Sequence, residues 1–342
     1  MKKSTHPTLS EVARKAGVGT TTVSRVINGG DRVSPKTLAH VLNVIEALGY
    51  SPNQAARTLK GHPTKTIGLV IPSIADPFFS SCAEAAQAVA RANESLLIVT
   101  TSHNDPHTEI ENISLLIRHR TDGLLIAPAN SHGPALRDLL RRTTVPVVAI
   151  DRPVYNSLIA SVVTNNFKGA NLATRHLIDH GFKHIACLTG ESTLYTISER
   201  IRGYREAIES AGLECILDTS IKDYKSAEYA IESLLAGPNP PDAIFTLKNS
   251  TTIHTFEVLQ KLNIRVPSSV ALLGFDDFEL ASTVRPSVTV VQQPVEEMGR
   301  IAAELLFEQL LDGGKGVGPA QQVKLEARLI KRSSCGCLPL MP

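Results

Sequence analysis

The first fifty residues contain apolar positions at helical spacing in three short runs. The first run opens with Thr8 and Glu11, which form a capping box that satisfies free N–H groups of the opening turn. Its apolar positions are Leu9, Val12, Ala13 and Ala16. Gly17 ends this helix, and a second helix is expected to extend to Asn28. We expect Val18, Val23 and Ile27, at and after the turn, to point into the small core.

A third helix is predicted between Ser34, which suits an N-cap, and Gly49, which suits a left-handed exit. Its expected buried positions are Leu38, Val41, Leu42, Ile45 and Leu48. Two short helices joined at a glycine and supported by a third form a helix-turn-helix arrangement.

The polar face of the second helix suits the major groove of DNA. Arg25 can donate two hydrogen bonds to a guanine edge, and Thr21 can meet a base edge or a thymine methyl. The candidate DNA contacts in this region are Thr8, Thr20, Thr21, Thr22, Ser24, Arg25 and Asn28. A solvated helical hairpin without a nucleic-acid partner is the alternative, but the caps, the core and the basic face together favour DNA binding.

From Ile67 the pattern changes to short β-branched runs that alternate with amphipathic stretches, which is typical of parallel α/β layers. The first series of expected strands is Ile67–Ile71, Leu96–Thr100, Gly123–Ile126 and Val145–Ile150. The second series is Ser161–Val163, His184–Leu188, Ala243–Thr246 and Val270–Leu273. A further strand, Val288–Gln292, leads into a long helix, Val295–Leu311, and two last strand-like pieces follow. Two series of strands predict two lobes.

Composition and charge locate the nucleic-acid end of the chain. The chain has 342 residues, of which 42% are apolar, enough for two or three globular domains. Its net charge of +2 is uneven, because residues 1–65 hold ten Lys and Arg against three Asp and Glu, or +7, and the remainder is −5. No membrane-spanning run and no signal peptide are evident, so we expect no membrane partner and a cytoplasmic location.

No metal site, cofactor or disulfide framework is expected. The five cysteines include no CxxC pair, and Cys335 and Cys337 stand in a tail that we expect to fray. His103 and His107 lack an evident third ligand. The glycine-rich run at 313–318 lacks the strand-turn-helix context of a phosphate-binding loop.

Several motifs resemble the lactose-repressor (LacI-GalR) family of transcription regulators. They are Thr8-Leu9, Glu11-Val12-Ala13, Ala16-Gly17-Val18, Thr22-Val23-Ser24-Arg25-Val26, Asn28 and Leu48-Gly49-Tyr50-Ser51-Pro52-Asn53, with Ala55, Ala56 and Leu59. One departure is Gly19, which stands where the family usually has a capping serine. The resemblance implies an all-α helix-turn-helix headpiece and an α/β two-lobed domain like periplasmic binding proteins, with two parallel sheets and three crossovers.

The resemblance also implies the domain limits. These are a headpiece at 1–51, a hinge helix and linker at 52–64, a two-lobed effector-binding and dimerisation domain at 65–334, and a tail at 335–342. In the family the hinge helix enters the minor groove of operator DNA and a leucine wedges a base step, which makes Leu59 the matching residue here. Asn53, Gln54 and Ala56 are further candidate DNA contacts on this segment.

A ligand is expected beyond the carboxyl ends of the strands, where ligands bind in open parallel sheets. By match to the family's effector pocket we select Asp151, Arg200, Asp276 and Gln293, with Ser73, Phe78 and Tyr224 as weaker candidates for the walls. The family usually has Asn-Asp where this chain has Lys248-Asn249. If Lys248 faces the ligand, it favours a sugar acid or a sugar phosphate; alternatively it points to solvent or pairs with Asp276.

The sequence therefore predicts a homodimeric, DNA-binding transcription regulator, a repressor rather than an enzyme, whose affinity for double-stranded operator DNA depends on a small sugar-like effector. Two alternatives use the same lobes. One is a sugar-binding protein of the periplasmic type. The other is a sugar-modifying enzyme that would use Asp151, Asp276 and Lys248.

Overall fold

A computed structural model describes residues 7–29, 32–51, 63–312 and 321–337. The chain forms two compact units, Met1–Thr64 and Lys65–Pro342, each described by itself. The candidate hinge contacts Asn53, Gln54, Ala56 and Leu59 and the glycine-rich run at 313–318 lie outside the described residues.

The N-terminal unit contains the three expected helices, α1 (Leu9–Ala16), α2 (Thr20–Ile27) and α3 (Pro35–Leu48). The Thr8–Glu11 capping box is present, and Gly17 adopts the left-handed conformation that ends α1. Gly19 caps α2 without a side-chain hydrogen bond, as its lack of a side chain requires.

Two details of the small helical core differ from the sequence analysis. Val26 is buried together with Val23, because residues three apart lie on the same face of a helix. Val18 and Ile27, which we expected in the core, are only half-buried. Leu42 is 47% exposed, although we expected it in the core. It follows the fully buried Val41, and consecutive helical residues point about 100° apart.

Lobe one is a sheet of six parallel strands in the order β11-β5-β4-β3-β1-β2. Its strands are β1 (Thr66–Ile71), β2 (Leu96–Thr101), β3 (Gly123–Ile126), β4 (Val147–Ile150), β5 (Ala160–Thr164) and β11 (Gln322–Leu325). One face is covered by α5 (Pro77–Ala92) and α12 (Val295–Leu311), the other by α6 (Pro106–Arg118) and α7 (Pro134–Arg142). Leu69 packs on the first face and Val70 on the second, so this central strand is apolar on both sides.

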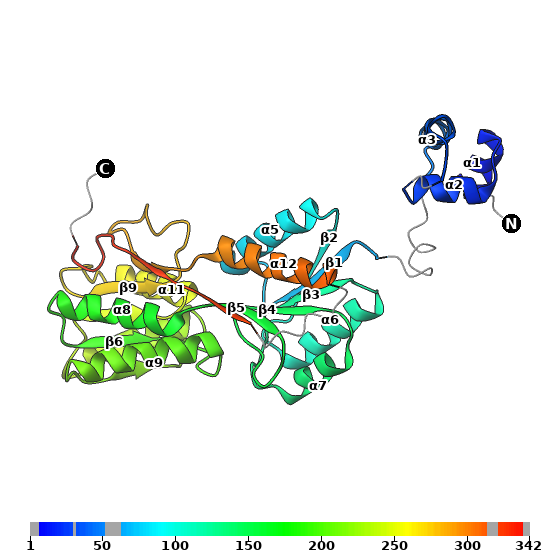
Figure 1. The fold of residues 1–342 in the computed structure, drawn as a ribbon. Helices are drawn as coiled ribbons and strands as arrows, with labels where there is room; N and C mark the ends of the chain where they lie inside the picture. The colour runs from blue at the N-terminus through cyan, green and yellow to red at the C-terminus, as the bar shows by residue number, and fades with distance from the viewer. Residues whose placement is uncertain (1–6, 30–31, 52–62, 313–320, 338–342) are drawn as a thin grey trace. The chain divides into compact units, whose positions relative to one another are not determined.

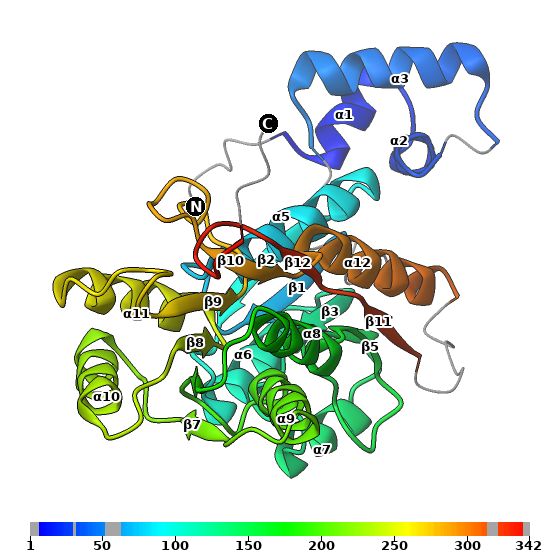
Figure 2. The ribbon, with the colours of Figure 1, turned by 90° about the vertical axis from the view of Figure 1, so that its left-hand side faces the viewer.

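Lobe two repeats this arrangement with the order β12-β10-β9-β8-β6-β7. Its strands are β6 (Ile185–Leu188), β7 (Ile216–Asp218), β8 (Ala243–Thr246), β9 (Ala271–Phe275), β10 (Thr289–Gln292) and the antiparallel edge strand β12 (Arg328–Ile330). Helices α8 (Asn166–Asp179) and α9 (Tyr195–Ser210) cover one face, and α10 (Tyr224–Ala236) and α11 (Asn249–Lys261) cover the other (Figure 2). The short β7 was not expected from the sequence.

The chain passes between the lobes three times, after β5, after β10 and after β11 (Figure 1). The predicted fold class is thereby confirmed, and helix α12 has the limits that the sequence predicted. In the part of the chain that the structure describes, no helix combines the length and the apolar character needed to cross a membrane.

The start of the C-terminal tail is ordered, which contradicts the expectation that it frays. The Leu272 amide donates to the Ser334 carbonyl over 2.8 Å, and the Ser334 hydroxyl accepts from the Thr289 amide over 2.8 Å. Cys335 is fully buried as a result. The tail therefore packs on lobe two at least as far as Cys337, the last described residue.

Candidate functional site

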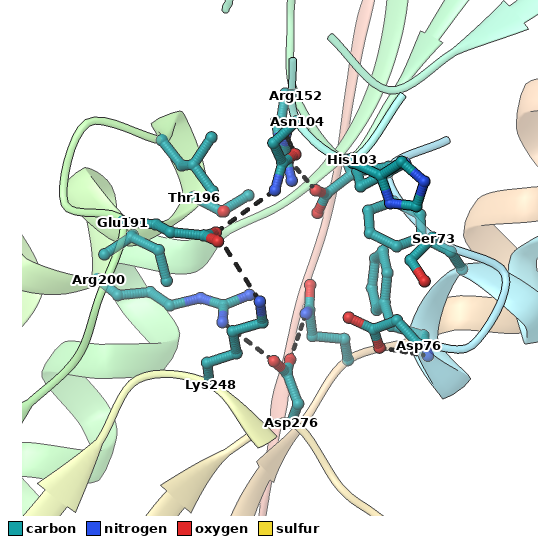
Figure 3. Close-up of a pocket in the computed structure, with 17 residues that line it drawn as sticks. Ser73, Asp76, His103, Asn104, Arg152, Glu191, Thr196, Arg200, Lys248 and Asp276 are labelled. Atoms are coloured by element: carbon teal, nitrogen blue, oxygen red, sulfur yellow. Dashed lines mark hydrogen bonds and ion pairs between the residues drawn. The ribbon is translucent and has the colours of Figure 1, made fainter. Parts of the chain in front are cut away.

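A cleft of about 230 Å3 lies where strands of both lobes end at their carboxyl edges. Seven of the eight candidate ligand residues line it, and these are Ser73, Phe78, Asp151, Arg200, Lys248, Asp276 and Gln293. Figure 3 labels Ser73, Arg200, Lys248 and Asp276 among them. Tyr224 does not line it. Tyr224 begins α10, where it packs against the core on the far face of the lobe-two sheet and edge-on to His254.

Arg200 and Asp276 form a buried ion pair on the lobe-two side of the cleft. The Arg200 Nη1 atom lies 3.1 Å from Asp276 Oδ2 and donates over 2.7 Å to the Leu247 carbonyl. The Arg200 Nε–H donates to Asn166 Oδ1, and the guanidinium stacks on the Phe275 ring. The Asp276 carboxylate also accepts from the Gln293 amide. Contacts from α8, from β9 and from the residues that follow β8 and β10 thus fix these two charges.

Asp151 and Arg152 form a second buried pair on the lobe-one side, with 3.1 Å between Arg152 Nε and Asp151 Oδ2. Arg152 also donates to the Asn104 side chain and to the Pro128 carbonyl. Burial raises the pKa of the Asp151 carboxyl above its usual value, and the Arg152 and Arg200 charges oppose this shift.

Lys248 faces the cleft and has an acidic neighbour. Its Nζ lies 3.8 Å from Glu191 Oε2. Asp276, the other partner that we considered for Lys248, forms its ion pair with Arg200. The Asn104 amide, from lobe one, also reaches Glu191 over 3.4 Å. Glu191 therefore links Lys248 to the opposite wall (Figure 3).

Backbone strain gathers at this cleft. Five lining residues other than glycine have φ between 47° and 74°, and they are His103, Asn104, Asp151, Glu191 and Asp276. Left-handed conformations of this kind cost free energy and collect where a site requires a set side-chain direction.

Phe78 and Phe79 supply the aromatic surface of the cleft. Their rings meet edge to face with centroids 4.9 Å apart, and Phe79 is buried. An apolar ring face beside carboxylates and guanidinium groups is suited to a ligand with one C–H face and several hydroxyls.

In the helical unit, the expected DNA-reading face is largely exposed. Thr20, Thr21, Arg25 and Asn28 are exposed, whereas Thr22 and Ser24 are half-buried. The Thr8 hydroxyl accepts from the Glu11 amide within the capping box. Arg25 is thus available to a base edge.

Comparison with known proteins places both units. Residues 64–333 match the model for periplasmic binding proteins and the sugar-binding domain of the LacI family, and residues 8–53 match that for bacterial regulatory proteins of the lacI family. The chain belongs to the lacI family. It is a DNA-binding transcriptional regulator with an effector-binding domain.

Three similar proteins illustrate this membership. The ribose operon repressor of Escherichia coli (strain K12) is 34% identical over 89% of this chain and 93% of its own length. A complex of the transcriptional regulator CelR with cellobiose is 32% identical, covers 96% of this chain and 100% of that one, and has a TM-score of 0.71. The lac repressor dimer bound to operator and the anti-inducer ONPF shares the fold, with 24% identity, coverage of 96% and 99%, and a TM-score of 0.86.

Some cleft residues of this lacI-family chain were missed from the sequence, notably Asn104, Glu191 and Thr196. Asn104 and Glu191 each come three residues after the end of a strand, β2 and β6, whereas Asp151 directly follows β4. The rule that ligands gather at the carboxyl ends of parallel strands, applied to every strand, would have found these two. Thr196, in the first turn of α9, offered no comparable signal.

Proposed function

We propose that this protein is a repressor whose operator affinity is set by a small neutral sugar. The observation that supports the ligand class is the pairing of charges in the cleft. The arginine and lysine side chains that line it are Arg152, Arg200 and Lys248, and each lies within 4.0 Å of a carboxylate. The cleft volume of about 230 Å3 is slightly below the range of about 300–1,000 Å3 common for ligand pockets.

This pairing argues against the sugar acid or sugar phosphate that Lys248 suggested. Four carboxylates line the cleft, since Asp76 joins Asp151, Glu191 and Asp276, against two arginines, one lysine and the imidazole of His103. An anionic ligand would have to compete with a carboxylate for each cation, whereas hydroxyl groups can hydrogen-bond to the pairs without breaking them.

Calorimetry with matched ligands tests the ligand class. D-ribose and cellobiose serve as neutral sugars, with ribose 5-phosphate and cellobionic acid as their anionic counterparts. We expect one neutral sugar to bind more tightly than its anionic counterpart, and Lys248→Met to change its Kd by less than the tenfold that about 1.4 kcal/mol represents. Tighter binding of the anion that is lost in Lys248→Met would contradict the proposal.

On the DNA side, we propose a homodimer in which each helical unit reads one half of a pseudo-palindromic operator. The exposed face of α2 and the basic N-terminal unit support this. Selection from a randomised duplex library with the full chain should enrich a two-fold-related sequence, and sedimentation should give two chains per duplex. Enrichment of a single half-site by one chain would contradict the dimer. Because such a regulator acts on chromosomal DNA, we also propose a cytoplasmic location.

We further propose that the ligand leaves the cleft chemically unchanged. Asp151 and Asp276 are each tied to a guanidinium group, so neither is placed as an unencumbered general base. A bound sugar incubated with the protein should give an unaltered NMR spectrum after many binding and release events. A new product whose formation stops in Asp151→Asn would support the enzyme instead.

A further inference from the structure

The C-terminal tail brings two cysteines against two histidines of lobe two, away from the ligand cleft. His176 lies in the last turn of α8, and His180 is the C-cap of that helix. Residues four apart share one helix face. Cys335 and Cys337 follow β12 and lie beside that face. Between them Gly336 has φ 86°, a left-handed conformation that glycine adopts readily.

The ligating atoms of His176, His180 and Cys337 lie within 4.8 Å of one another, and Cys335 Sγ adjoins this group through its contact with His176. Cys337 Sγ lies 3.2 Å from His180 Nε2 and 3.5 Å from His176 Nε2. Cys335 Sγ lies 3.3 Å from His176 Nε2. In a tetrahedral zinc site, Zn–S and Zn–N bonds of normal length place sulfur and nitrogen about 3.6 Å apart. The observed spacings are therefore close to the edges of a zinc tetrahedron.

Neighbouring groups hydrogen-bond to the histidine and cysteine side chains in the way that groups around a bound metal hydrogen-bond to its ligands. His180 Nδ1 lies 2.8 Å from the His176 carbonyl, which can only accept, so Nδ1 bears the proton and Nε2 presents its lone pair to the cluster. The Thr289 hydroxyl lies 3.1 Å from Cys335 Sγ and can donate to a thiolate. Hydrogen bonds of both kinds fix tautomer and ligand direction around bound metals.

We propose that His176, His180, Cys335 and Cys337 form a binding site for a divalent metal ion of the zinc class. Two thiolates and two neutral imidazoles suit Zn2+ by ligand type, and they balance its charge, which favours burial beside the fully buried Cys335. With four protein ligands the coordination is complete, so the ion has a structural role and joins the tail to α8.

The site is separate from the ligand cleft along the same helix. Asn166, the first residue of α8, accepts a hydrogen bond from Arg200, and His176 lies ten residues further along. Ten helical residues span about 15 Å. Loss of the metal should accordingly leave the Arg200–Asp276 pair in place.

Metal titration of the full chain under reducing conditions tests the proposal. Zn2+ affinity is measured against a chromophoric chelator, and Co2+ is used as a spectroscopic probe of the ligands. The wild-type chain should bind about one Zn2+ in a closed four-ligand site, and Co2+ should give tetrahedral d–d bands with a thiolate charge-transfer band. Cys337→Ser and His180→Gln should each weaken binding by at least about 100-fold, since even loss of an outer partner costs about 10–100-fold.

Two matched controls are available. Cys215 is an exposed free cysteine outside the cluster, and His119 is the exposed C-cap of α6, as His180 is of α8. Cys215→Ser and His119→Gln should keep the wild-type affinity, and far-UV circular dichroism identifies any variant that fails to fold. Because Cys337 and His180 are replaced in separate variants, the test still stands if one of the two variants fails to fold. A wild-type chain that binds Zn2+ no more tightly than either folded variant would reveal plain S–H···N hydrogen bonds and overturn the proposal.

Discussion

Replacement of Arg200 by Met should strongly destabilise lobe two. The substitution keeps the unbranched aliphatic stem and removes every N–H donor. The side chains of Arg200 and Asp276 are only 4% and 12% exposed, so water cannot replace the lost partner. Asn166 Oδ1, the Leu247 carbonyl and the Asp276 carboxylate would each lose a hydrogen bond.

The expected cost follows from this geometry. Removal of one member of a buried ion pair typically costs about 3–5 kcal/mol, because the other charge stays buried without compensation. Asp276 keeps its bond from Gln293, which places the expected value near the lower end of that range. Asp276→Asn removes the orphaned charge. The double variant should therefore lose less stability than the sum of the two single variants, by about 1–3 kcal/mol.

Urea unfolding measures these differences. The chain has no tryptophan, and five of its six tyrosines lie beyond residue 65, so tyrosine fluorescence reports mainly on the two-lobed unit. Arg300→Met is the control, because the Arg300–Glu304 pair has side chains 50% and 44% exposed and should contribute less than about 1 kcal/mol. Equal losses in Arg200→Met and Arg300→Met, or strict additivity in the double variant, would refute the reasoning.

Three further predictions concern DNA reading, pH and helix packing. Arg25→Ala should weaken specific DNA binding by about 1–3 kcal/mol and relax base preference in anisotropy titrations; an equal loss on random DNA would contradict base reading. Burial raises the pKa of Glu109 from 4.5 to about 7, so the unfolded chain releases this proton at lower pH than the folded chain. Stability should fall by up to about 3 kcal/mol as the pH rises from about 4.5 to 7. Glu109→Gln should abolish this fall in urea titrations at pH 5 and 8, and an unchanged fall would exclude Glu109 as its cause. Gly203→Ala would place Cβ 2.2 Å from the Phe167 carbonyl oxygen, force α8 and α9 apart, and cost about 1–3 kcal/mol in the same assay; wild-type stability would show that the helices adjust freely.

Much of the fold could be predicted because the local signals agreed with the tertiary structure. Gly17 and Gly49 end helices in left-handed conformations, and the apolar runs of the central strands β1, β3 and β4 are buried in lobe one. Leu42 shows the limit of periodicity. A leucine fits the apolar stripe of α3, yet the core of so small a unit admits one narrow stripe, which Val41 occupies.

The cleft could be predicted where a residue follows a strand and matches a family motif, as Asp151 and Asp276 do. Tyr224 met neither condition as closely, since it begins a helix on the other face of the sheet. The partner of Lys248 was beyond sequence reasoning, because Glu191 is 57 positions away and reaches it through a left-handed turn. The contact of Cys335 with His176 could not be predicted for the same reason. The two residues are 159 positions apart, and the packing of the tail on lobe two brings them together.

The contacts that join the lobes across the cleft suggest how a ligand could act on this protein. Asn104 of lobe one reaches Glu191 of lobe two, and Asn249 of lobe two reaches Asp76 of lobe one, each over 3.4 Å. A typical intramolecular hydrogen bond contributes about 0.5–1.5 kcal/mol to stability, and these two are longer than typical. A shift of a two-state equilibrium from 1:99 to 99:1 needs about 5.5 kcal/mol. These two bonds together fall short of that amount. In the proposed function, a sugar that hydrogen-bonds to the ion pairs of both lobes supplies the larger part of any shift between two lobe arrangements.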